Sequence, residues 1–160
     1  SNFNGSGYDI ACADSISPIL YKLEDKKPVI ENTSFNPLFS NNLFFIHLNK
    51  KQNTNIEIKN FYSKKVSANF IEAFSVLTKK FILSNNLSDF QNCIIEHEKL
   101  LSKELNIPTV KNTLFSDYDG EIKSLGAWGG DFILAAGPID SPSYFTKKGY
   151  STIIPFKKMF

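Results

Sequence analysis

The sequence contains no arginine, and this absence narrows the partners that the protein can recognise. All 18 basic residues are lysines, and 16 acidic residues leave a formal charge of +2. A lysine ammonium is a point charge, whereas the arginine guanidinium forms paired hydrogen bonds to bases and phosphates. We therefore expect no nucleic-acid partner. Lysines and backbone amides can still hold the phosphate of a small molecule.

Cysteines and long apolar runs are also scarce. Cys12 and Cys93 are far apart and form no metal-binding motif, so we expect two buried free thiols. The longest apolar stretches, 43–46 and 132–136, are too short to cross a bilayer, and the first residues lack the pattern of a secretory signal. These features predict a cytoplasmic protein without a membrane partner.

The composition is that of an ordinary folded domain. With 160 residues, 42% hydrophobic and 21% charged, the chain suits one domain or one domain with part of another. Apolar patterning between turn-forming residues predicts strands over 19–23, 29–35, 43–49, 122–125, 131–136 and 151–156. Helical spacing and capping residues predict helices over 9–16, 64–83, 88–105, 108–118 and 141–148, and Ser88 is the expected cap of the third. We expect the first three strands to pair antiparallel, and an α+β fold with an antiparallel sheet packed against helices.

The first glycine-rich segment is Gly5-Ser6-Gly7-Tyr8-Asp9. Glycines permit unusual backbone angles and leave room for a charged ligand to approach the main chain. Asp9 follows this turn directly, at the start of a predicted helix. Its carboxylate either caps that helix or stands at the rim of a phosphate site.

The second glycine-rich segment runs from Lys123 to Asp131 and lies between two predicted strands. It contains Gly126, Gly129 and Gly130, three glycines within five residues. Such a loop can bring backbone amides to an anion, but it can also be a structural hairpin.

Together these segments resemble the C-terminal half of the GHMP kinase superfamily, named for galactokinase, homoserine kinase, mevalonate kinase and phosphomevalonate kinase. The segment 5–11 looks like the Ser-Gly-x-Asp motif of the mevalonate and phosphomevalonate branches, and Gly-Tyr-Asp-Ile-Ala is similar to the bacterial GYDIA-type subgroup. The segment 126–130 looks like the third, glycine-rich motif of the superfamily. The resemblance covers essentially the whole chain and implies a ferredoxin-like C-terminal domain.

The resemblance also implies a reaction. ATP, with Mg²⁺, would phosphorylate a mevalonate-like alcohol or a phosphomonoester, and Asp9 would orient or deprotonate the acceptor. Lys123 falls on a basic position before the third motif. The phosphate and acceptor pocket would be formed by Gly5, Ser6, Gly7, Lys123, Ser124, Gly126, Ala127, Gly129 and Gly130. No protein ligand for a metal is expected within this chain.

Three positions depart from the family pattern. Leu125 stands where serine or threonine is usual, so a hydroxyl contact to phosphate would have to come from Ser124. Trp128 and Asp131 stand where glycine is common, which narrows the loop and adds a negative charge. These departures predict that the molecule which accepts the phosphate is unusual for the family.

The ATP-binding Pro-x-x-x-Gly-x-x-Ser-Ser-Ala loop of the superfamily has no counterpart in these residues. We therefore expect 1–35 to be the end of an N-terminal GHMP-type domain and 36–160 to be the C-terminal domain. The fragment alone should be inactive, and its missing N-terminal domain should be a partner, with self-association into a homodimer as another way to cover the exposed surface. The alternative is a noncatalytic ferredoxin-like module that binds a metabolite or another chain.

The acidic segment before 122 and the two histidines indicate neither a metal site nor a catalytic site. The acidic segment 117–121 resembles a calcium loop at first sight, but lacks the later ligands, so we predict a turn. His47 and His97 are single and far apart, which favours neither a zinc site nor a nucleophile–histidine pair.

Overall fold

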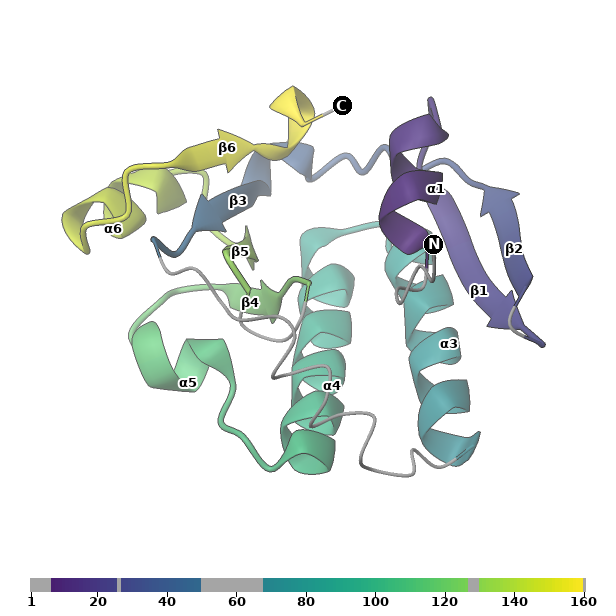
Figure 1. Ribbon diagram of the computed structural model, residues 1–160. Coiled ribbons are helices and arrows are strands. Elements are labelled where there is room, and N and C mark those ends of the chain that lie inside the picture. The colour runs from purple at the N-terminus through teal and green to yellow at the C-terminus, as the bar shows by residue number, and fades with distance from the viewer. Residues whose placement is uncertain (1–6, 26, 50–67, 127–129, 160) are drawn as a thin grey trace. The chain divides into compact units, whose positions relative to one another are not determined.

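The computed structural model describes residues 7–25, 27–49, 68–126 and 130–159. The chain divides into two compact units, Ser1–Asn36 and Pro37–Phe160. Antiparallel sheets and packed helices confirm the predicted α+β class (Figure 1). The assignment of the two parts to the two domains of a kinase stays a prediction.

The first unit contains one short helix and one hairpin. Helix α1 covers Tyr8–Asp14, and strands β1 (Ile19–Glu24) and β2 (Lys27–Asn32) pair antiparallel from Ile19↔Asn32 to Glu24↔Lys27. The rings of Tyr8 and Tyr21 meet edge to face, with centroids 5.9 Å apart, and so join α1 to β1. Among the described residues of this unit no side chain is buried.

The second unit is built on a four-stranded antiparallel sheet with the order β4-β5-β3-β6. Its strands are β3 (Leu43–His47), β4 (Glu121–Ser124), β5 (Phe132–Ala136) and β6 (Ile153–Pro155). Strand β3 lies in the middle, with Phe44 opposite both Ala135 of β5 and Pro155 of β6. The prediction that the third strand pairs with the first two is therefore wrong, since tertiary packing places β3 in a separate sheet.

The described residues of this unit contain four α-helices: α3 (Ala68–Leu83), α4 (Leu87–Leu105), α5 (Val110–Leu114) and α6 (Ser141–Lys147). Short 3₁₀ turns, η1 (Ser40–Asn42) and η2 (Phe156–Lys158), precede β3 and follow β6. Helix α3 lies beside α4, and α4 in turn contacts β4 and β5 (Figure 1). None of the helices in the described ranges is long and apolar enough to cross a membrane.

The core of the second unit is aromatic and aliphatic. Its packed side chains include Phe44 and Ile46 of β3, Ile133 of β5, Phe115 directly after α5, and Phe145 of α6. All of these except Phe44 are fully buried. Leu43 and Ala136, which alternate with the core residues along their strands, are fully buried as well, so the central strands are covered on both faces.

A close backbone approach at Gly120 helps to hold the sheet to the preceding turn. A Cβ atom at this position would lie 2.6 Å from the carbonyl oxygen of Ala136, too close for any side chain. Next to it, the hydroxyl groups of Tyr118 and Ser141 form a buried hydrogen bond of 2.7 Å. Residues 117–120 thus form a turn, as predicted, and this turn packs on the core, while Glu121 already begins β4.

Two helices begin at other residues than predicted, because a neighbouring residue supplies the cap. Helix α4 begins at Leu87, and the side chain of Asn86, not that of Ser88, accepts the hydrogen bond from Asp89 N at 2.9 Å. Thr109 caps α5, which is shorter than the predicted 108–118 helix. The predicted helix start at 64–67 lies outside the described residues.

Of the two thiols, Cys93 is buried as predicted, but Cys12 is exposed because α1 buries no side chain.

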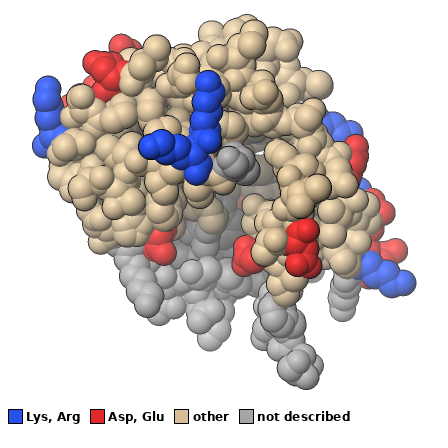
Figure 2. Space-filling model, turned by 90° about the horizontal axis from the view of Figure 1, so that it is seen from above, with Lys and Arg blue, Asp and Glu red and all other residues tan. Residues whose placement is uncertain are grey.

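Charged side chains do not gather into one strong patch on the face shown in Figure 2. Lysines and acidic residues appear there in small groups separated by uncharged residues.

Candidate functional site

The first predicted segment is described from Gly7 onward, while Gly5 and Ser6 lie outside the described residues. Gly7 has φ +77°, a left-handed conformation that favours glycine, and stands immediately before α1. Its carbonyl oxygen accepts a hydrogen bond from Ala11 N at 3.1 Å. The glycine therefore sets the backbone direction with which the helix begins.

Asp9 lies in the first turn of α1 and is exposed. The prediction that its side chain caps the helix is wrong, because the helix starts one residue earlier and Gly7 occupies the capping position without a side-chain bond. A carboxylate in the first turn is still favoured by the partial positive charge of the helix N-terminus. Asp9 thus presents a solvent-accessible acceptor at the end of the glycine turn.

The environment of Asp9 includes a perturbed tyrosine. A hydrogen bond with Cys12, together with partial burial, raises the pKa of Tyr8 to about 12. Tyr8 and Ile10 are each half exposed. The start of α1 therefore offers both a carboxylate and uncovered apolar surface.

The second predicted segment forms the connection between β4 and β5. Lys123 and Ser124 end β4, Gly126 follows with φ +63°, and Gly130 precedes β5. Ala127, Trp128 and Gly129 lie outside the described residues. The strands on either side pair antiparallel, with Ser124 opposite Ile133.

Ser124 points its polar atoms toward helix α4. Its backbone N–H and its hydroxyl both donate to Glu98 Oε1, over 3.1 Å and 2.9 Å. Its carbonyl oxygen accepts a hydrogen bond of 3.1 Å from the ammonium of Lys123. The hydroxyl proton of Ser124 is thus already used within the protein.

Glu98 is the centre of this polar cluster and is buried. His97 Nδ1 lies 3.0 Å from the same carboxylate oxygen, and because a carboxylate only accepts, Nδ1 carries the proton. Burial lowers the pKa of His97 despite its hydrogen bond to Glu98. Burial likewise lowers the pKa of Lys123, while the charge of Glu98 opposes this shift.

Sequence reasoning missed Glu98 and gave His97 no role. A signal was present, since Glu98 lies four residues after Ile94 and three before Leu101, in the apolar stripe of α4. A carboxylate in such a stripe must find hydrogen-bond donors when it is buried. The strand that supplies them could not be identified from the helix pattern.

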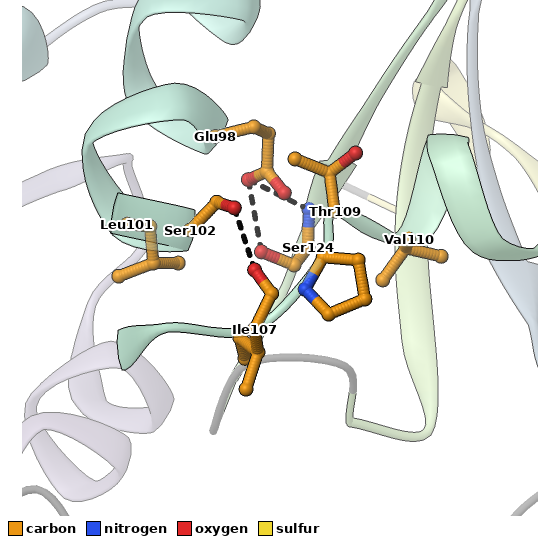
Figure 3. A pocket seen from close by; sticks show the side chains of 8 residues that line it. Glu98, Leu101, Ser102, Ile107, Thr109, Val110 and Ser124 are labelled. Carbon is orange, nitrogen blue, oxygen red and sulfur yellow. Dashed lines mark hydrogen bonds between the residues drawn. The ribbon is translucent and has the colours of Figure 1, made fainter. Parts of the chain in front are cut away.

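Two hollows adjoin the cluster. A small cavity of about 40 Å³, drawn in Figure 3, is lined by Glu98, Leu101, Ser102, Ile107, Pro108, Thr109, Val110 and Ser124. A larger groove of about 410 Å³ shares Glu98, Ser102 and Thr109 with it. The first has room for water, whereas the second has the size of a small-molecule site.

The predicted site residues are therefore divided between the two units. Gly7 and Asp9 belong to the first, and Lys123, Ser124, Gly126 and Gly130 are brought together in the second. In the described ranges, no group of three or more His, Cys, Asp and Glu side chains could hold a metal ion. No protein-family model matches this chain, and no curated protein matches it either.

Proposed function

We propose that this chain is the C-terminal part of a cytoplasmic, ATP-dependent kinase of the GHMP superfamily. The kinase would transfer phosphate to a mevalonate-like alcohol or a phosphomonoester. The observation that carries the proposal is the exposed carboxylate of Asp9 two residues after a left-handed glycine, Gly7, within the Gly-Ser-Gly-Tyr-Asp motif. The Gly126 loop supplies the second motif in its expected order along the chain.

The strand order supports the ferredoxin-like part of the proposal. Along the second unit the strands and α-helices run β3, then α3, α4 and α5, then β4, β5, α6 and β6, and the first and third of these strands are neighbours at the centre of the sheet. A β-α-β-β-α-β succession of this kind is the ferredoxin-like motif. In this arrangement the β4–β5 connection holds the Gly126 loop at one end of the sheet.

The proposed chemistry uses Asp9 as a positioning group or general base. An alcohol that donates a hydrogen bond to this carboxylate would be aligned for attack, and the carboxylate could take its proton. ATP with Mg²⁺ would supply the transferred phosphoryl group and neutralise its charge. Because the described residues hold no candidate metal cluster, we assign Mg²⁺ to the nucleotide and the proposed N-terminal domain.

A second candidate, the noncatalytic interaction module, is favoured by apolar side chains in the first unit. Ile10, Ile16, Val29 and Ile30 are all exposed there. Exposed apolar groups in one small unit are typical of a surface that another protein part covers. In this alternative the exposed residues, and not Asp9, carry the function.

The test is ADP release by the longer protein of which this chain would form the end, with isoprenoid and sugar alcohols as acceptors. Asp9→Asn should lower kcat by about a hundredfold or more, because it removes the charged proton acceptor. Asp14→Asn is the matched control, since it makes the same change at the exposed C-terminal end of the same helix. It should leave kcat within about twofold.

Equal turnover of the Asp9→Asn and Asp14→Asn proteins would refute the role of Asp9. A longer protein that binds no ATP would refute the kinase proposal itself and favour the interaction module. In that case Ile16→Asp and Ile30→Asp should abolish capture of the partner without unfolding the second unit.

A further inference from the structure

A groove of about 410 Å³ lies between α4, the start of α5 and the edge strand β4. Helix α4 contributes a single face to it, because the lining positions recur at intervals of three and four. They are Ile95, Glu98, Lys99, Ser102 and Lys103. Thr109, Lys111 and Asn112 form the α5 side, and Glu121 and Ile122 form the β4 side.

The groove carries an excess of positive charge. Lys111 is paired with Glu121 over 2.7 Å. Lys99 and Lys103, in contrast, form no ion pair with any of the described residues, and both are exposed. Their separation of four residues places the two ammonium groups side by side on the helix, where one dianion can contact both.

The wall of the groove holds a carboxylate with one oxygen left open. Glu98 Oε1 receives three hydrogen bonds, of which Figure 3 draws the two from Ser124, and Oε2 receives none from the described residues. Glu98 is 7% exposed and lines both hollows, and among the described residues no side-chain oxygen is both fully buried and without a partner, so Oε2 reaches solvent. It can therefore accept a hydrogen bond from a molecule in the groove.

The charge of the groove decides which kind of donor fits. The groove already holds the ammonium groups of Lys99 and Lys103, which form no ion pair with the described residues. An ammonium from a ligand would add a further positive charge beside them. A neutral hydroxyl donates the hydrogen bond without this cost.

We propose that this groove binds a small phosphate ester that carries a free hydroxyl group. The phosphate dianion lies between Lys99 and Lys103, and the hydroxyl donates to Glu98 Oε2. The site uses neither Asp9 nor the loop 126–130, so it stands independently of the kinase function proposed above.

The probe is sn-glycerol 3-phosphate, titrated into the ¹⁵N-labelled chain and followed by NMR. Saturable shifts are expected for amides of 95–103, 109–112 and 121–124. Methyl phosphate, which lacks a hydroxyl, should bind about tenfold more weakly, and glycerol should not bind.

Variants separate this site from general attraction to lysines. The double change Lys99→Ala and Lys103→Ala should weaken binding of the probe at least about tenfold. Lys79→Ala, which removes an exposed lysine from α3, is the matched control and should bind as the wild type does. Glu98→Gln keeps one oxygen for Ser124 and should reduce the preference for glycerol 3-phosphate over methyl phosphate.

Each outcome decides for or against the proposal. Absence of saturable shifts, or shifts unaffected by loss of Lys99 and Lys103, would overturn it. Equal affinity for methyl phosphate in the wild type would refute the hydroxyl contact and with it the proposed ligand class. Heteronuclear spectra of every variant report whether the fold is intact. ADP release by the longer protein is a separate readout, so failure of this site and failure of the kinase function are distinguishable.

Discussion

The two units of this chain contain similar strands in different surroundings. In the first unit, Val29 and Ile30 of β2 are 44% and 50% exposed, whereas Ile133 and Leu134 of β5 in the second unit are 0% and 7% exposed. Strand β2 has one partner, but β5 lies between β4 and β3. The comparison shows that an apolar pair predicts a strand, while neighbouring layers decide whether the strand contributes to a core.

The difference also separates the two candidate motifs. Asp9 lies in a unit without a buried side chain among its described residues, and Ser124 is buried against Glu98 in a unit with a full core. We expect changes at Asp9 to alter turnover, and changes at the buried residues of the second unit to alter the free energy of unfolding.

The largest effect on stability is expected at Phe115. Its side chain is fully buried, and Phe115→Ala should lower the free energy of unfolding by about 3–5 kcal/mol because it leaves a cavity. Ile16→Ala in the first unit should change it by no more than about 0.5 kcal/mol, since Ile16 is fully exposed. Urea unfolding followed by circular dichroism measures both. Equal losses would show that the first unit has a core of its own.

Hydrogen exchange sharpens the comparison between the two sheets. Backbone amides of β3 that bond to β5 should exchange about a hundredfold or more slowly than those that join β1 and β2, because a two-stranded hairpin opens easily. Exchange followed by NMR or mass spectrometry gives the rates. Similar protection in both sheets would mean that the hairpin is covered in solution.

A smaller effect is expected when Glu98 is removed. Glu98→Ala leaves the buried N–H and hydroxyl of Ser124 without their acceptor, and should cost about 1–3 kcal/mol of unfolding free energy. Glu31→Ala, at an exposed position of β2, is the control and should have little effect. Denaturant titrations that gave the two variants the same midpoint would show that the Glu98 cluster does not stabilise the second unit.

The smallest effect concerns an exposed ion pair in the second unit. Hydrogen bonds from Lys148 and Tyr144 lower the pKa of Asp117 from 3.8 to about 2. A lowered carboxyl pKa stabilises the folded state above about pH 4, and this contribution is lost as the pH falls toward 2. Asp117→Asn should therefore be less stable than the wild type at pH 6, with a smaller difference near pH 2.

Thermal unfolding at several pH values tests this sign. Asp119→Asn serves as the control because Asp119 is exposed and lies two residues along the same turn. A stability difference for Asp117→Asn that stayed constant from pH 6 to pH 2 would contradict the assigned cause.

Much of the fold was predictable from local patterns. The residues of β1, β5 and α4 carry apolar spacing that matches their structure, so their predicted ranges differ from the observed bounds by one residue at most. Capping was harder to predict, because Asn86 and Ser88 are both good capping residues and the difference depends on where the chain turns. Cys12 was misplaced for a similar reason, since residue type does not reveal whether a neighbouring layer exists.

The candidate sites likewise contain some residues that local sequence patterns reveal and others that they do not. Asp9 and the glycine loops could be singled out from sequence, because a carboxylate beside glycines is a local signal. The position of Glu98 in an apolar stripe was also a local signal, but its hydrogen-bond partner could not be predicted, since Ser124 is 26 residues away and on another element.

By itself, the sequence determined the class of the fold, the approximate positions of its helices and strands, and the two glycine-rich motifs, because propensity, spacing and turn chemistry act over a few residues. Only the tertiary structure decided that β3 lies in the middle of a separate sheet, that Asp9 is exposed and that Glu98 is buried beside a groove. These properties depend on which distant segments meet, since the burial and hydrogen bonding of a side chain are set by its neighbours in space.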